Sequence, residues 1–261
     1  MQQVRLFFIA LQFFTRLPIP AWVGFDPAWL QHASRYFPLV GCVVAAIAAG
    51  VYYAAALVLP APVAAVLSTA ASIYATGAFH EDGFADTCDG LGGGMTTARV
   101  LEIMKDSRVG AYGAIGIVCM LAAKLSSLAM LPPRAAIVAL FLAHPLSRLA
   151  AVSLIWRLDY VRGEGKAKPL AQQMTTAEFA IATVTALLPA AVLLVTGLTS
   201  AGALLAALLA ALLSAVWLGR KFLRRIGGYT GDCLGAVQQV AEAAIYMAVL
   251  ATLGMGAWPS T

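Results

Sequence analysis

The sequence predicts an all-helical, polytopic integral membrane protein. Of its 261 residues, 61% are hydrophobic and only 11% are charged, and the mean hydropathy is +0.85. Soluble domains average about 45–50% apolar and about 25% charged residues, so this composition excludes an ordinary soluble protein. The apolar residues also gather in repeated runs of about 20, the length at which a helix crosses roughly 30 Å of hydrocarbon. We therefore expect a single membrane domain that covers residues 1–261.

Residues 1–20, MQQVRLFFIALQFFTRLPIP, predict a helix at the membrane surface rather than a span. The apolar stretch from Leu6 to Phe14 is too short to cross the bilayer, and Arg16 and two prolines end it. No small-residue cleavage pattern follows, which disfavours a removable signal peptide. We interpret the segment as an interfacial amphipathic helix with Arg5 and Arg16 toward the lipid head groups.

Seven apolar runs follow a polar connector at residues 21–35, and each predicts one membrane-spanning helix. The expected spans are residues 36–59, 61–80, 111–131, 135–157, 179–197, 200–218 and 236–254. The fifth and sixth runs are poor in polar residues and rich in alanine and glycine, which permits close helix packing and indicates a structural role.

The positions of lysine and arginine predict the orientation of these spans, because positively charged short loops stay in the cytoplasm. One side of the predicted topology receives 14 basic residues, and the other receives only Arg134. The 14 are Arg5, Arg16, Arg35, Arg99, Lys105, Arg108, Arg157, Arg162, Lys166, Lys168, Arg220, Lys221, Arg224 and Arg225. We therefore expect a multi-pass protein of the bacterial inner membrane with a cytoplasmic N-terminus and an outer C-terminus. The net charge of +5 fits anionic substrates, and no aromatic-interleaved basic surface indicates nucleic acid.

Residues 80–113 concentrate acid in a chain that has only 12 Asp and Glu residues. Six of these occur here, namely Glu81, Asp82, Asp86, Asp89, Glu102 and Asp106. Asp82, Asp86 and Asp89 stand at i, i+4 and i+7, so a helix would place them on one face. Because neighbouring carboxylates repel one another, the pattern is favourable when a cation binds between them, and oxygen ligands of this kind suit Mg²⁺.

The alternative interpretation of this stretch is a solvated acidic turn between two helices. Gly83, Gly90 and residues 92–94 count against it. Glycine permits close approach of a bulky anionic ligand, and it also permits the helix to break beside the carboxylates.

Basic residues on the same predicted face are candidates for binding phosphate oxygens. Arg99, Lys105 and Arg108 lie within the acidic stretch, and Arg220 and Arg224 stand at i and i+4 just after the sixth span. The alternative for the second group is anchoring of that span by lipid phosphates. The following residues, GGYTGD from 227 to 232, favour a phosphate-binding turn that includes Tyr229 and Asp232.

Ionisable residues also occur away from the end residues of predicted spans, where charge is costly and indicates function by default. They are Lys124, His144, Arg148 and Glu242. The alternatives are that Lys124 and Arg148 snorkel to the interface, that His144 is a packing residue, and that Glu242 pairs with a cytoplasmic arginine.

Several motifs together resemble the adenosylcobinamide-GDP ribazoletransferases, also called cobalamin synthases. They are FHEDGFADTCDGLGGG at 79–94, EIMKDSRVGAYG at 102–113, GGYTGDCLGA at 227–236, LQFFTRLPIP at 11–20 and RYFPLVG at 35–41. The resemblance implies a Mg²⁺-dependent inner-membrane transferase of cobalamin biosynthesis. Such an enzyme joins adenosylcobinamide-GDP to α-ribazole or its 5′-phosphate and releases GMP.

Residues 86–90, DTCDG, also resemble the first half of the motif of the CDP-alcohol phosphotransferases. The second half departs from that motif, because Gly93 and Gly94 stand where it has Ala and Arg. Asp82, four residues before Asp86, is a candidate for the missing carboxylate.

We accordingly expect Asp82, Asp86 and Asp89 to hold one or two Mg²⁺ ions, with Glu81 as a further ligand. Asp106 is expected as another ligand or as a base, and which aspartate acts as the base is left open. The expected substrate-binding residues are Arg99, Lys105, Arg108, Arg148, Arg220, Arg224, Tyr229 and Asp232. A homo-oligomer is compatible with this sequence.

Two other functions remain open at this point. A different membrane transferase, of the CDP-alcohol or prenyl-diphosphate type, would release CMP or pyrophosphate instead of GMP. A transporter would need acids near the bilayer midplane, whereas most acids here lie at the cytoplasmic ends of spans.

Overall fold

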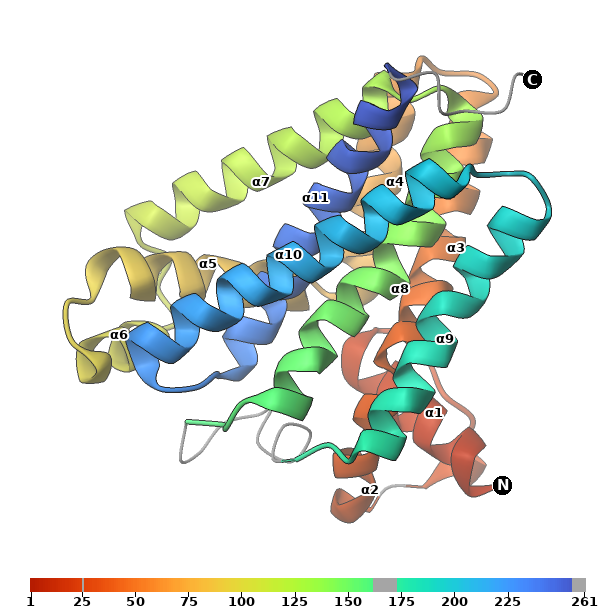
Figure 1. Ribbon diagram of the computed structural model, residues 1–261. Helices are drawn as coiled ribbons and strands as arrows, with labels where there is room; N and C mark the ends of the chain where they lie inside the picture. The colour runs from red at the N-terminus through yellow and green to blue at the C-terminus, as the bar shows by residue number, and fades with distance from the viewer. Residues whose placement is uncertain (25, 162–172, 255–261) are drawn as a thin grey trace.

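The computed structural model describes residues 1–24, 26–161 and 173–254, and in these ranges the chain forms helices and no β-strand (Figure 1). The α-helices are α1 (Gln2–Phe14), α2 (Pro27–Ala33), α3 (Phe37–Ala56), α4 (Ala61–Thr76), α5 (Phe79–Gly93), α6 (Thr97–Ile103), α7 (Ala111–Met130), α8 (Pro133–Arg157), α9 (Thr176–Val195), α10 (Ala201–Ile226) and α11 (Gly231–Leu253). Two short 3-10 helices, Ala21–Val23 and Ser34–Tyr36, precede α2 and α3.

Six helical stretches in the described ranges are long and apolar enough to cross a membrane. They are Ala28–Ala56, which joins α2 to α3, and the five helices α7 to α11. A seventh span results if the bent pair α4 and α5 is counted as one. The prediction of an all-helical, multi-pass membrane protein is therefore confirmed.

The second predicted span, residues 61–80, is wrong in its last part. α4 ends at Thr76, and α5 continues at an angle of 90° to it. Gly77 and Ala78 both adopt left-handed backbone conformations, with φ of 65° and 58°. The Ala78 N–H donates back to the carbonyl of Ile73 at 2.9 Å, which is the usual way a helix end is closed by a left-handed residue. As a result α5 extends sideways from the end of α4, toward the left of the molecule in Figure 1.

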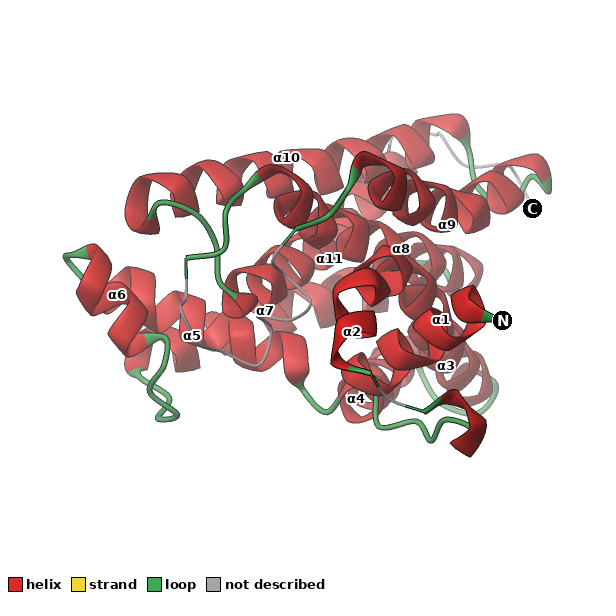
Figure 2. Ribbon diagram, turned by 90° about the horizontal axis from the view of Figure 1, so that it is seen from below, coloured by secondary structure: helices red, strands yellow, loops and turns green. Residues whose placement is uncertain are grey.

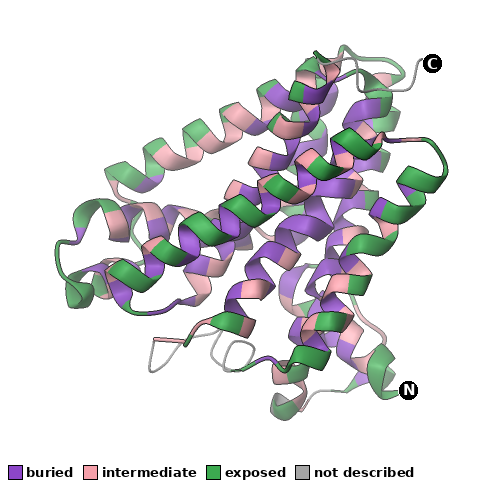
Figure 3. Cartoon of the chain, viewed as in Figure 1, coloured by how far each residue is buried: buried purple, intermediate pink, exposed green. Residues whose placement is uncertain are grey.

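The core is organised around α8, with α3, α9, α10 and α11 packed against it (Figure 2). The most apolar windows of α8 and α11 are 83% and 67% buried, whereas those of the other spanning helices are 22–39% buried. Figure 3 shows the same concentration of buried residues along α8 and α11. Since α11 also packs against α5 and α7, it connects the core to the acidic helix.

The connections between helices alternate between the two ends of the molecule, as the pattern of basic residues predicts. The N-terminus, α2, α6 and the α10–α11 connection lie at the lower end in Figure 1. The α3–α4, α7–α8 and α9–α10 connections lie at the upper end. Arg134, in the first turn of α8, is therefore at the opposite end from α5 and α6. Arg162, Lys166 and Lys168 lie outside the described residues.

The predicted N-terminal amphipathic helix is present as α1, and its apolar face packs into the core. The segment that follows α1 lies against the α4–α5 bend. The Arg16 N–H donates to the carbonyl of Ala75 at 2.8 Å, and the Arg16 guanidinium lies 5.7 Å from the Tyr74 ring. A β-carbon on Gly77 would lie 2.8 Å from Arg16 Nε. This segment therefore supports the bend in addition to any contact with lipid.

Candidate active site on helix α5

The four predicted metal ligands, Glu81, Asp82, Asp86 and Asp89, all lie on α5, so the expected helical placement of the acids is confirmed. The glycines permit a helix break beside the carboxylates, but the helix continues through Gly83, Gly90 and Gly92 and ends at Gly93.

The same glycines allow close contact with other parts of the protein. A β-carbon on Gly83 would meet the backbone of Asp232. One on Gly90 would meet the side chain of Met104, and one on Gly94 would meet the side chain of Val100. Glycine at these positions therefore permits helix packing, and the room expected for a ligand is filled by neighbouring protein.

Asp89 binds the beginning of α7. Its two carboxylate oxygens accept hydrogen bonds from the backbone N–H groups of Gly110, at 2.7 Å, and Gly113, at 2.8 Å. The first amides of a helix lack partners within the helix, and its N-terminus favours negative charge. Asp89 is only 8% exposed. It therefore fixes α5 to α7, a role that the sequence alone did not reveal.

Glu81 faces the core rather than an open surface. Its Oε1 accepts a hydrogen bond from Gln239 Nε2 of α11 at 2.9 Å, and its Oε2 is buried without a hydrogen-bond partner. The helical rotation of 100° per residue places it on a different side of α5 from Asp82 and Asp86. The geometry does not support the expected grouping of Glu81 with these residues around one ion.

Asp82 and Asp86 lie one turn apart on one side of α5, away from the Glu81 contact with α11. Asp82 is exposed and Asp86 is half-buried. The N-terminus of α11 crosses α5 beside them, because a β-carbon on Gly83 would be 3.0 Å from the Cα of Asp232. The Thr230 hydroxyl lies 3.3 Å from the Asp232 carboxylate and accepts the N–H of Cys233 at 3.4 Å. Three carboxylates therefore occur near one helix crossing.

In the described part of the chain, no three or more His, Cys, Asp or Glu side chains converge closely enough to form a complete metal site by themselves. Mg²⁺, however, is usually held by one or two carboxylates together with water and substrate phosphates. The pair Asp82 and Asp86 fits this donor set.

The basic residues of the acidic stretch lie on and after α6, which packs against α5. Arg99 pairs with Glu102 at 2.8 Å, and both side chains are exposed, as is Lys105. Arg108 pairs with Asp106 at 2.7 Å. These residues lie at the same end of the molecule as Asp82 and Asp86.

Asp106 does not fit the expected role of general base. The hydrogen bond from the Arg108 side chain is the main cause that lowers the pKa of Asp106 to about 2. A base with so low a pKa accepts a proton poorly near neutral pH.

The other predicted substrate-binding arginines are widely separated. Arg148 is buried in α8, where its Nη1 donates to the carbonyl of His144 at 3.0 Å and its Nε has no hydrogen-bond partner. Arg220 lines a groove of about 490 Å³ beside Trp156 and Phe179, on the side of α10 that faces α8 and α9. Arg224 is exposed in the last turn of α10. Arg148 also lines a cavity with Phe79 and His80 of α5 and Gly231 of α11, so it lies beside the start of α5. Arg220 does not.

Tyr229 is fully buried, so its expected contact with substrate is not supported. Its N–H donates to the carbonyl of Asp159 at 3.0 Å, and its carbonyl accepts the N–H of Val161 at 3.0 Å. Burial raises the pKa of the Tyr229 phenol, which is therefore uncharged at neutral pH. The residue connects the α10–α11 turn to the segment after α8.

A groove of about 550 Å³ opens between α7 and α10, with Phe84, Cys88, Tyr112 and Trp217 among its lining residues. Phe84 and Cys88 each stand two positions from Asp82 and Asp86 along α5, a rotation of about 200°. The groove therefore lies on the opposite side of α5 from the candidate site.

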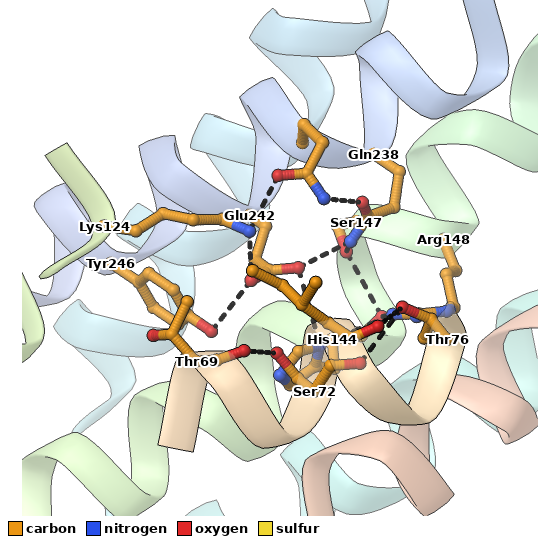
Figure 4. Close-up of polar contacts among 12 residues, drawn as sticks. Thr69, Ser72, Thr76, Lys124, His144, Ser147, Arg148, Gln238, Glu242 and Tyr246 are labelled. Carbon is orange, nitrogen blue, oxygen red and sulfur yellow. Dashed lines mark hydrogen bonds and ion pairs between the residues drawn. The ribbon is translucent and has the colours of Figure 1, made fainter. Parts of the chain in front are cut away.

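The ionisable residues of the predicted spans form one buried network (Figure 4). Glu242 of α11 accepts hydrogen bonds from Lys124 of α7 at 2.7 Å, from Gln238 at 2.5 Å and from Tyr246 at 3.1 Å. His144 Nδ1 lies 3.4 Å from the same carboxylate. Lys124 is 2% exposed, so it does not snorkel, and the partner of Glu242 is this lysine rather than a cytoplasmic arginine. The adjacent amides of Gln238 and Gln239 in an apolar span were a signal for this network that sequence reasoning missed.

A family model described as cobalamin-5-phosphate synthase matches residues 6–250 of the chain. Relatives named adenosylcobinamide-GDP ribazoletransferase match over nearly the full length. The one from Leptothrix cholodnii is 47% identical and covers 98% of this chain and 97% of its own. Those from Shewanella frigidimarina and Shewanella woodyi are 44% and 48% identical, with 96% and 95% of this chain and 96% of each relative covered.

The chain belongs to the cobalamin-5-phosphate synthase family. The resemblance indicated by the motifs is thereby confirmed. No solved structure matches the chain.

The family motifs that carry no acid also lie beside α5. From the motif at residues 11–20, the Phe14 ring stacks on His80 of α5 with centroids 5.8 Å apart, and the Phe13 ring centroid lies 5.4 Å from that of Phe79. From the motif at residues 35–41, Phe37 packs edge-on against Phe14 at 4.1 Å. Motifs that are distant in this family's sequence therefore meet where α5 begins.

Proposed function

We propose that this protein is an adenosylcobinamide-GDP ribazoletransferase that acts in the late part of cobalamin biosynthesis. The match of a single family over residues 6–250, with relatives 44–48% identical, carries this proposal. The position of two carboxylates, Asp82 and Asp86, on an accessible side of α5 supplies a compatible site.

The reaction is a transfer at phosphorus. A ribose hydroxyl of α-ribazole attacks the phosphorus attached to the corrinoid side chain, the bond to the GMP oxygen breaks, and the hydroxyl proton is released. Bound Mg²⁺ supplies charge neutralisation for the diphosphate, as in other phosphoryl transfers. The protein contributes the carboxylates of Asp82 and Asp86 as ligands and exposed cations such as Lys105 for phosphate oxygens.

Among the predicted base candidates, Asp82, Asp86, Asp89 and Asp106, we favour Asp82 or Asp86 over Asp106 and Asp89. Asp106 has a pKa lowered to about 2, and both oxygens of Asp89 already accept backbone hydrogen bonds. A base must lie within hydrogen-bond reach of the attacking hydroxyl, which favours the open side of α5.

We also propose that the end of the molecule with α5 and α6 faces the cytoplasm of a bacterial inner membrane. The basic residues gather at this end, and Arg134 lies at the other. The family description names a 5-phosphate product, which favours α-ribazole 5′-phosphate over α-ribazole as the second substrate.

The test is GMP release by the purified protein in vesicles supplied with adenosylcobinamide-GDP, Mg²⁺ and either form of ribazole. We expect GMP to appear only when a ribazole and Mg²⁺ are both present, and to appear faster with the 5′-phosphate. Mg²⁺-independent release would remove the metal from the reaction. Release of CMP or pyrophosphate from the corresponding activated substrates, without GMP release, would favour the alternative transferases.

A further inference from the structure

The buried network in the membrane core extends to the first turn of α5. Gln239 of α11 occupies the junction, because its Oε1 accepts a hydrogen bond from Lys124 at 2.8 Å and its Nε2 donates to Glu81 at 2.9 Å. Lys124 in turn pairs with Glu242. A continuous path of polar contacts therefore joins α7 and α11 to Glu81, the residue directly before Asp82.

This path is costly to bury, so its presence requires an explanation. Lys124, Gln239 and Glu242 are 2%, 2% and 4% exposed, respectively. Buried ion pairs contribute little net stability compared with well-packed apolar residues, and their best-attested use is to specify one arrangement among several. A fully connected buried network also makes its own geometry rigid.

α5 is an element whose orientation needs such specification. The left-handed residues Gly77 and Ala78 interrupt the helix before it, so α4 does not determine how α5 is rotated about its axis. Glu81 lies in the first turn after this bend. With 100° of rotation per residue, holding Glu81 against α11 directs Asp82 and Asp86 about 100° and 140° away from that contact.

We propose that Glu81, Gln239, Lys124 and Glu242 are positioning residues that set the rotation of α5 and thereby the placement of Asp82 and Asp86. The inference rests on the proposed function, since it assigns these residues to the site of that reaction. It gives Glu81 a hydrogen-bonding role in place of the metal-binding role expected from the sequence.

The first test separates hydrogen bonding from metal binding at Glu81. Glu81→Gln retains an oxygen that accepts from Gln239 and removes the charge. We expect its turnover number to stay within about threefold of wild type and its apparent Mg²⁺ activation constant to be unchanged. A tenfold or larger rise in that constant would make Glu81 a ligand and overturn the proposal.

The second test uses Gln239→Leu and the double variant Glu81→Leu/Gln239→Leu. Both variants remove the oxygen that accepts from Lys124, which keeps its pairing with Glu242. The single variant also leaves Glu81 without its donor, whereas the double variant removes both partners of the Glu81–Gln239 hydrogen bond. We expect turnover to fall at least tenfold in both, with little change in KM. Thermal unfolding in detergent should recover in the double variant relative to the single one, while turnover should not.

Recovery of turnover together with stability in the double variant would show that the Glu81–Gln239 contact is only structural. Wild-type turnover in Gln239→Leu would show that the contact does not matter for the reaction.

Ser147→Ala is the matched control, because it removes a 3.2 Å hydrogen bond to Gln238 in the same network without touching Glu81. Its turnover should match wild type, and a loss like that of Gln239→Leu would contradict a role specific to α5. Absence of GMP release by wild-type protein would instead reject the proposed function itself.

Discussion

Asp89 differs from Asp82 in what its carboxylate does, although a sequence pattern groups the two together. Both oxygens of Asp89 accept backbone hydrogen bonds at the start of α7, whereas Asp82 is exposed. The helical spacing of the acids was sufficient to predict their common helix and face. It could not distinguish them further, because the amides of Gly110 and Gly113 reach Asp89 only through the tertiary packing of α7.

The Asp89→Asn substitution should therefore lower stability in the absence of Mg²⁺. An amide keeps one acceptor oxygen but turns an NH₂ group toward a backbone N–H, and leaving a buried donor unsatisfied costs about 1–3 kcal/mol. Asp82→Asn, on an exposed side chain, should change stability by less than about 0.5 kcal/mol. Chemical denaturation of the two variants in the same detergent compares them directly. Equal stability of both variants would show that the Asp89 contacts contribute nothing to the fold.

Asp106 and Arg108 give a prediction about pH. The Arg108 side chain lowers the pKa of Asp106 from the ordinary 3.8 to about 2. The pKa of Asp106 is lower in the folded protein than in the unfolded chain. The Asp106–Arg108 interaction therefore stabilises the folded state above pH 3.8, and this contribution disappears as pH falls through about 2. Arg108→Ala should raise the Asp106 pKa toward its ordinary value, as measured by carboxyl NMR titration. Because neither value is near neutrality, the pH dependence of turnover between pH 6 and 8 should not change, and a shifted profile would indicate that Asp106 takes part in proton transfer.

The length of the apolar run at residues 61–80 did not predict the bend between α4 and α5. Residues 61–80 have the composition of a span, yet Gly77 and Ala78 divide it and turn the chain by 90°. A glycine within an apolar run is a weak signal by itself. The left-handed conformation of Ala78, with φ of 58°, is not visible in local sequence, and the distant segment around Arg16 contacts the neighbouring Ala75.

Substitutions at Ala78 should reveal the strain in this bend. A residue with a β-carbon in the left-handed region costs roughly 1–2 kcal/mol, and glycine avoids most of this cost. Ala78→Gly should therefore raise or preserve the melting temperature, whereas Ala78→Val should lower it because a β-branched side chain tolerates this conformation poorly. Scanning calorimetry or a thiol-reactive melting assay in detergent would measure both. A stabilising effect of valine would mean that the residue leaves the left-handed region in solution.

For the whole molecule, composition and basic-residue asymmetry predicted the class and the alternation of the chain between two ends. They succeeded because hydrocarbon requires long apolar helices and because 14 basic residues occur at one set of connections against one at the other. The interior polar network was not predictable as a unit, since Lys124 lies on α7 and its partners Gln239 and Glu242 lie on α11, far along the chain.

The orientation in the bilayer can be tested with reporter fusions. A reporter at the C-terminus should indicate the periplasm, and one inserted into the segment between α8 and α9 should indicate the cytoplasm. Insertion next to Arg134 provides the matched control on the outer side. Reporters that give the same location at the C-terminus and between α8 and α9 would contradict an odd number of crossings after α8.

The central claim is that Asp82 and Asp86, on the open side of α5, bind the divalent ion, while Glu81 and Asp89 hold the helix in place. Mn²⁺ suits the same oxygen ligands as Mg²⁺ and is detected by electron paramagnetic resonance. We would titrate Mn²⁺ into protein saturated with adenosylcobinamide-GDP and compare wild type with Asp82→Asn, Asp86→Asn, Glu81→Gln and Asp89→Asn. The account predicts that the dissociation constant rises at least about tenfold, or about 1.4 kcal/mol, in each of the first two variants and stays within about threefold in the other two. Equal Mn²⁺ affinity in all five proteins, or loss confined to Glu81→Gln and Asp89→Asn, would contradict it.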